Sequence, residues 1–151
     1  MDYLLAHRGQ VHYPPHDVRT ETIHHVRSLA DVHELVNRTQ GLTIDCSQAV
    51  TMLLLSVGCK NPNGANTDGY TGTLLANLKH YSDGRRAMVG ALVVFGPGTG
   101  HHVAMVHTPD PVHGNPLLWS QGQESDPRLI YLSQEQAFQP WPHTFLSIAK
   151  L

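Results

Sequence analysis

The sequence has little charge, and no sign of charge dominates. Of its 151 residues, 15% are Asp, Glu, Lys or Arg, and the formal net charge is −2 with neutral histidines. Proteins whose main partner is nucleic acid or an anionic lipid surface usually have a clustered excess of positive charge. The composition therefore argues against nucleic acid as the partner of this protein.

Long apolar segments are also missing. No stretch approaches the ~18 consecutive apolar residues that a membrane-spanning helix needs. The first residues, Met1 to Arg8, place an acid before a very short apolar run, which is unlike a secretory signal peptide. We therefore expect that the protein does not insert into a membrane and that it is made in the cytoplasm without a signal peptide. A target outside the cell would then require a separate delivery route.

Cysteine is scarce, and the two residues present are Cys46 and Cys59. The predicted helix between them would hold them roughly 20 Å apart, whereas a disulfide needs Cα atoms within about 7 Å. We therefore expect two free thiols, as in a reducing cytoplasm.

Histidine, in contrast, is abundant, with 12 residues. The sequence nevertheless contains neither HExxH nor CxxC, the common signatures of zinc sites. His24, His25 and His33 could share a helix, but acidic or cysteine ligands at matching spacing are missing. We expect no metal and no organic cofactor, and a zinc-dependent hydrolase remains an alternative.

The length is that of one domain, so residues 1–151 are interpreted as a single unit, possibly one module of a longer protein. The first half has helical patterning and the second half has strand patterning, which is typical of the α+β class. Helices are predicted over 2–8, 20–36 (with Thr20 or Thr22 as N-cap), 45–57 and 71–81, strands over 91–95, 102–107, 117–121, 128–132 and 145–149, and a loop over 60–69. The simplest assembly is a small antiparallel sheet of about five strands with the N-terminal helices packed on it.

Cys46 stands at the start of the clearest helix, within Asp45-Cys46-Ser47. Unpaired backbone N–H groups and the helix dipole at such a position favour the reactive thiolate. A small buried hydrophobe is the alternative interpretation of Cys46, because cysteine is often buried. Cys59 has no such position and is interpreted as structural.

A cysteine nucleophile needs a base, and a third group usually orients that base. His101 and His102 begin a predicted strand after a glycine turn, and they must face opposite sides of it, so only one can face Cys46. The third group should come from the neighbouring strand, where Ser120 and Gln121 are both available.

Three segments together resemble the NlpC-type family of papain-like cell-wall cysteine peptidases: Asp45-Cys46-Ser47 at a helix start, then residues 90–95, then His102-Val103-Ala104-Met105-Val106. The resemblance runs from about residue 13 to about residue 132. Its register selects His102 over His101 as the base and assigns the third catalytic role to Gln121. It also implies a papain-like fold, with Tyr13 lining the site.

The resemblance implies a peptidoglycan endopeptidase that cleaves an amide of the stem peptide, commonly the bond between γ-D-glutamate and diaminopimelate. The backbone N–H of Cys46 would help to bind the oxyanion, and the surrounding substrate contacts are assigned to Asp45, Ser47, Tyr13 and His101. Residues 119–125 and the loop 60–70 resemble segments of phage lysins, the loop those of phages that infect mycobacteria and their relatives. We therefore expect a monomeric, bacteriolytic endolysin domain, reaching the wall through a holin or as part of a virion.

Other functions remain open from the sequence. The same fold could serve as a non-catalytic binding module or phage-tail component. The same thiol and imidazole could also serve an amidase or a transpeptidase, since all are acyl transfers. A cytoplasmic toxin exported by a dedicated secretion machine would likewise lack a signal peptide.

Overall fold

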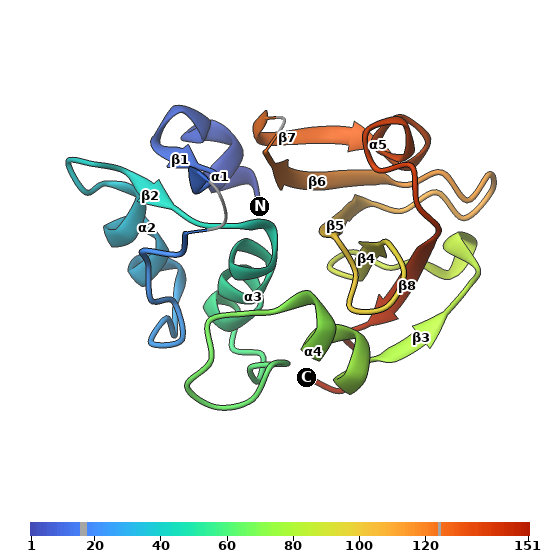
Figure 1. The fold of residues 1–151 in the computed structure, drawn as a ribbon, viewed down its shortest axis with the longest axis horizontal. Coiled ribbons are helices and arrows are strands. Elements are labelled where there is room, and N and C mark those ends of the chain that lie inside the picture. The colour runs from blue at the N-terminus through green and yellow to red at the C-terminus, as the bar shows by residue number, and fades with distance from the viewer. Residues whose placement is uncertain (16–17, 124) are drawn as a thin grey trace.

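The computed structural model describes residues 1–15, 18–123 and 125–151, and its architecture is α+β, as the sequence predicts (Figure 1). The α-helices of these ranges are α1 (Asp2–Ala6), α2 (Leu29–Val36), α3 (Cys46–Ser56), α4 (Thr71–Asn77) and α5 (Leu132–Phe138). The strands are β1 (Val11–His12), β2 (Leu42–Thr43), β3 (Lys79–Tyr81), β4 (Leu92–Phe95), β5 (His102–Thr108), β6 (Leu117–Gly122), β7 (Ser125–Tyr131) and β8 (His143–Ser147). None of the helices in the described ranges is both long and apolar enough to cross a membrane.

A six-stranded antiparallel sheet forms the second half of the chain, in the order β3-β8-β4-β5-β6-β7. The predicted hairpin of β4 and β5 is confirmed, with Phe95 opposite His102. The sheet has one strand more than expected, because residues 79–81 form the edge strand β3 and not the end of a helix. Beyond β7 the chain turns into helix α5, which the sequence did not predict.

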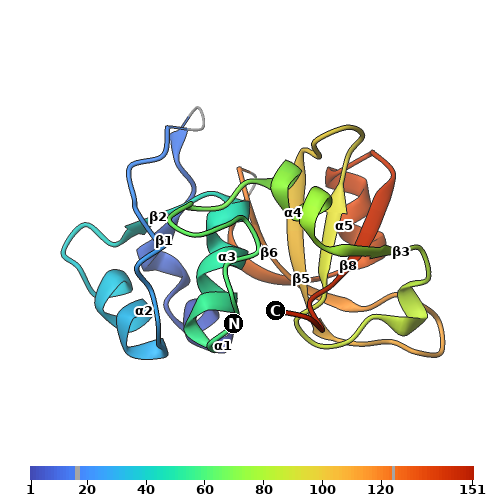
Figure 2. The same cartoon turned by 90° about the horizontal axis from the view of Figure 1, so that it is seen from below.

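Helix α3 is the centre of the hydrophobic core, and all of its residues are buried. It packs on the face of the sheet formed by alternate residues of β5 and β6, among them Val103, Met105 and Trp119. Ala104 and Val106 point to the opposite face, into a second apolar cluster that includes Leu132 of α5. The helices of the N-terminal half therefore cover one face of the sheet, and α5 lies on the other side (Figure 2).

The predicted helix over residues 20–36 is wrong in its first half. Helix α2 begins only at Leu29, after Ser28, which forms a capping box with Asp31. Upstream, the backbone N–H groups of Ile23 and His24 donate to the carboxylate of Asp68, at 2.7 and 2.9 Å. Asp68 thus accepts the hydrogen bonds of backbone N–H groups that the predicted helix would have used, and this segment is not helical. Thr20 and Thr22 are therefore not helix caps.

A short pair of parallel strands positions the segment that leads into α3. Strand β1 pairs with β2 through Val11 opposite Leu42 and His12 opposite Thr43. The N–H of Ile44 then donates to the carbonyl of His12 at 3.0 Å. This pairing brings the segment that contains Tyr13 alongside the residues that lead into Cys46.

Candidate functional site

Cys46 is the first residue of helix α3, as the sequence predicts, and it is only 5% exposed. Asp45 caps this helix: its carboxylate accepts from the N–H of Gln48 at 2.8 Å, and the Gln48 side chain accepts from the N–H of Asp45 at 3.2 Å. The N–H of Cys46 lies in the first turn, where a helix offers it no carbonyl acceptor. A thiol and a free backbone donor are thus held together at the positive end of the helix.

Arg19 fixes the start of α3 from outside. Its guanidinium donates to the carboxylate of Asp45 at 2.6 Å, to the hydroxyl of Ser47 at 3.0 Å and to the carbonyl of Gly69. Ser47 in turn donates to Asp45 at 2.8 Å. The side chains of Asp45 and Ser47, through Arg19, therefore hold the helix start and the loop before α4 together. Their expected contact with substrate stays a prediction.

His102 lies where the sequence places it, at the first residue of β5, and it is near enough to Cys46 for that side chain to raise the pKa of the imidazole. On its other side, Nε2 lies 2.9 Å from Oγ of Ser120 and 3.1 Å from Oε1 of Glu135. The His102 side chain is 4% exposed, so these neighbours and not water have the main effect on its protonation. The structure thus brings Cys46 and His102 close together, and their expected catalytic roles stay a prediction.

Glu135, in helix α5, is fully buried and is the unexpected member of the site. Its Oε1 accepts from the hydroxyl of Ser120 at 2.8 Å, and its Oε2 accepts from Arg128 at 3.0 Å. Burial by itself would raise the pKa of the Glu135 carboxyl. Hydrogen bonds from His102, Ser120 and Arg128, with the charge of His102, outweigh burial and lower that pKa below its usual value.

The environment of His102 strongly favours the imidazolium form. Burial alone would lower the pKa of His102, because a charged ring loses hydration. Hydrogen bonds to Cys46 and Glu135, and the negative charge of both groups, have the larger combined effect and raise the pKa to about 10. The imidazolium of His102 is therefore favoured near neutral pH, between Cys46 and the carboxylate of Glu135.

Gln121, expected to orient His102, lies elsewhere. Its amide nitrogen donates to the carbonyls of His12 at 3.2 Å and Ile44 at 3.0 Å. The sequence left open whether Ser120 or Gln121 is the third residue. The structure brings Ser120 to the ring of His102 and places Glu135 behind it, because alternate residues of β6 face opposite sides of the sheet.

A pocket of about 280 Å³ opens beside His102. Two of the expected substrate contacts, Tyr13 and His101, line it. The ring of His101 stacks on that of Trp141, with ring centroids 4.4 Å apart. The remaining lining residues are Gly122, Gln123, Gln139 and Trp141.

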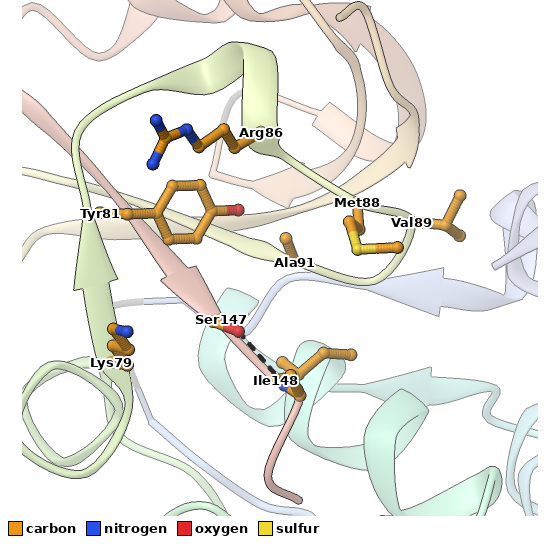
Figure 3. A pocket seen from close by; sticks show the side chains of 9 residues that line it. Lys79, Tyr81, Arg86, Met88, Val89, Ala91, Ser147 and Ile148 are labelled. Atoms are coloured by element: carbon orange, nitrogen blue, oxygen red, sulfur yellow. Dashed lines mark hydrogen bonds between the residues drawn. The ribbon is translucent and has the colours of Figure 1, made fainter.

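A larger pocket, of about 520 Å³, lies at the other end of the sheet (Figure 3). It is lined by Tyr81 of β3, Ser147 of β8 and Met88 of the connection that leads to β4. Ala91, at its edge, precedes β4, whereas His102 pairs with Phe95 at the far end of that strand. This pocket is therefore separate from the Cys46 site in spite of its size.

The two cysteines are free, as expected, with Cys46 buried and Cys59 partly buried. Within the described residues, no three His, Cys, Asp or Glu side chains converge in a way that could hold a metal ion. Glu135 is the residue that the sequence analysis missed. One signal was available, since it is the single acid in the otherwise neutral segment 129–138.

The arrangement has the parts needed for nucleophilic acyl transfer: a thiol, an imidazole in contact with it and a carboxylate that holds the imidazole. No protein-family model, no curated protein and no solved structure matches this chain. The chemistry of the site must therefore be inferred from its own side chains.

Proposed function

We propose that this protein is a cysteine peptidase that hydrolyses an amide bond in the stem peptide of peptidoglycan. The observation that carries the proposal is the buried imidazole of His102, in contact with the Cys46 thiol on one side and with Glu135 on the other. A structural cysteine does not require a buried imidazolium partner. Perturbed titration of this kind is a frequent mark of a catalytic group.

In the proposed reaction, the proton of Cys46 resides on His102, and the thiolate attacks the amide carbonyl carbon. The backbone N–H of Cys46 donates to the oxyanion that forms. The tetrahedral intermediate collapses with cleavage of the C–N bond, and the proton of His102 passes to the leaving amine. Water, deprotonated by His102, then hydrolyses the thioester and regenerates the thiol.

Glu135 is the orienting group in this scheme. Its carboxylate holds the Nε2 side of His102, and we infer that this leaves the other ring nitrogen to serve the thiol. Ser120 and Arg128 in turn fix the carboxylate. A negatively charged partner stabilises an imidazolium better than a neutral amide would.

The substrate class comes from the resemblance to NlpC-type cell-wall peptidases. A nucleophile at a helix start, with its base at the start of the second strand of the β4–β5 hairpin, is consistent with the papain-like fold of that family. We place the protein among phage lysin catalytic domains that act as monomers on the cell wall after holin-type release or as part of a virion.

The test is digestion of purified peptidoglycan of the diaminopimelate type, with fragments identified by mass spectrometry. Wild-type protein and Cys59→Ala should release peptides with new free amines, and Cys46→Ala should release none. Cys59→Ala is the matched control because it removes the other free thiol.

Two outcomes would contradict the proposal. Release that persists in Cys46→Ala and stops with a chelator would indicate a metal-dependent hydrolase. Binding of wall without release by any variant would indicate a non-catalytic or tail-associated module.

A further inference from the structure

The pocket at the β3 end of the sheet, of about 520 Å³, has no part in the proposed reaction. It lies on the face of the sheet opposite α3, because Tyr81 and Ala91 of its lining pack with the apolar cluster of that face. Short side chains at Ala91, Ser147 and Ala149 leave its space open. Its volume is in the range of pockets that hold small molecules.

One part of this pocket is apolar and exposed. Met88 and Val89, which are 74% and 59% exposed, line it together with Ile148. Between them and β4, Gly90 has a φ of 83°, and a Cβ atom added there would lie 2.9 Å from Cδ1 of Ile148. The connection to β4 thus runs close to Ile148 and presents two adjacent apolar side chains to water, where a ligand could cover them.

The other part of the pocket is positively charged. Lys79 of β3 and Arg86 of the short 3-10 helix Gly84–Arg86 both line it, and no Asp or Glu is found among its described lining residues. Arg86 pairs with Asp83 at 3.6 Å, but both side chains are largely exposed. Such a pair is weak, so an incoming anion can replace Asp83 as the partner of the guanidinium.

The two parts lie on opposite sides of the pocket. Figure 3 shows Lys79 and Arg86 on one side, Met88 and Val89 on the other, and the ring of Tyr81 between them. A small hydrophilic anion would use only the charged side, and a neutral apolar molecule would use only the apolar side. A molecule with an apolar chain and an anionic head group would match both sides at once.

From this arrangement we propose that the pocket binds a free aliphatic carboxylate of medium chain length. Lys79 and Arg86 hold the carboxylate, and the chain lies along Met88, Val89 and Ile148. Burial of the chain supplies most of the affinity, and the two cations select the charged head group. The inference does not depend on the proposed peptidase activity, because the pocket is separate from the Cys46 site.

The first measurement is calorimetric titration of the wild-type protein with hexanoate, octanoate and decanoate, each below the concentration at which it forms micelles. Every two added methylene groups should strengthen binding by about fivefold, which is less than full burial would give because the exposed rim leaves part of the chain in water. Decanol has the same chain without the charge. It should bind about fivefold more weakly than decanoate, the size expected for an exposed ion pair.

Arg86→Gln tests the charged side of the pocket. Arg86 is exposed, so the variant should fold. It removes one of the two cations, and the preference for decanoate over decanol should fall to about twofold. Arg8→Gln, at an exposed position outside the lining, removes the same charge and should leave the preference unchanged.

Met88→Glu tests the apolar side. It places a carboxylate where the chain should lie, so decanoate should bind about tenfold more weakly or worse. Val112→Glu is the matched control, because Val112 is 69% exposed and lies outside the lining. Circular dichroism establishes that both variants are folded.

Three results would overturn the inference: no saturable binding of any of the carboxylates, equal binding of decanoate and decanol, or equal loss of binding in Met88→Glu and Val112→Glu. Association with vesicles of anionic phospholipid without binding of free decanoate would also overturn it, and would make this face a membrane contact. None of these results concerns the release of wall peptides, so the failure of this inference and that of the proposed function are observed separately.

Discussion

The carboxylate of Glu135 lies 3.1 Å from Nε2 of His102, and the two side chains are 0% and 4% exposed. A buried ion pair of this kind is stable only when the remaining hydrogen-bonding capacity is also satisfied. Ser120 and Arg128 supply that satisfaction for the carboxylate. Residues from three consecutive elements, β6, β7 and α5, therefore hold the proposed base, His102, in position.

Replacement of Glu135 by glutamine should lower activity and narrow its pH range. The change removes a negative charge that raises the pKa of His102, so the alkaline limb of kcat/KM should move from near pH 10 to lower pH. We expect about a hundredfold loss of kcat at neutral pH, within the usual range for a group that orients a catalytic base. The measurement is a pH–rate profile, with Glu34→Gln, on the exposed surface of α2, as control. An unchanged alkaline limb would remove Glu135 from the mechanism.

Replacement of Gln121 by leucine should act on stability and not on protonation. Its amide satisfies the carbonyls of His12 and Ile44, so the variant leaves these groups without that donor at a cost of about 1–3 kcal/mol. Urea denaturation should record this loss, and the alkaline limb of kcat/KM should stay in place. If the alkaline limb of kcat/KM shifted in Gln121→Leu but not in Glu135→Gln, then Gln121 and not Glu135 would be the residue that orients His102.

Stability should decrease as pH rises above neutrality. The pKa of His102 is raised from 6.5 to about 10 on folding, so its contribution is complete below about pH 6.5 and is lost as pH rises toward 10. The decrease should amount to a few kcal/mol in urea denaturation at pH 6.5, 8 and 10. In Cys46→Ala the decrease should be smaller, because one of the two groups that raise this pKa is absent. A wild-type stability that stays constant across this range would contradict the charge state assigned to His102.

Two glycines of the loop before α4 provide a matched pair for testing how this loop meets the nucleophile helix. Gly69 and Gly64 have similar positive φ angles, 98° and 96°. A Cβ atom added at Gly69 would lie 2.6 Å from the carbonyl oxygen of Ser47, whereas a Cβ atom added at Gly64 would have no other atom within 4 Å. Gly64→Ala should therefore cost about 1 kcal/mol from backbone strain alone. Gly69→Ala should cost roughly 1–3 kcal/mol more, since backbone must shift. Thermal denaturation compares them, and equal losses would show that the contact with Ser47 is not tight.

Much of the fold follows from local sequence. Asp45 and Gln48 are spaced as a capping box, and a run of apolar residues follows them, so the start of α3 can be predicted from the chain. The hairpin of β4 and β5 is likewise marked by two apolar runs around a glycine turn. By contrast, the backbone near Ile23 has helical spacing but is held by Asp68, a contact that no local pattern contains.

The site was predictable only in part, for a related reason. Val103 and Met105 pack toward α3, and strict alternation along β5 then assigns His102 to the opposite face. That face carries Ser120 and Glu135, while the position of His102 at the strand start still lets its ring meet Cys46. Glu135 comes from a helix beyond the sheet, and sequence spacing does not specify which helix packs there.

The position of β8 in the sheet has a consequence for how the molecule is made. β8 is the last strand of the chain, and yet it lies between β3 and β4 and bonds to both. On the ribosome, β3 therefore has no neighbour in the sheet until β8 has emerged, about 60 residues later. This half of the sheet cannot assemble before then, and a protease that removes β8 would separate β3 from the rest of the sheet.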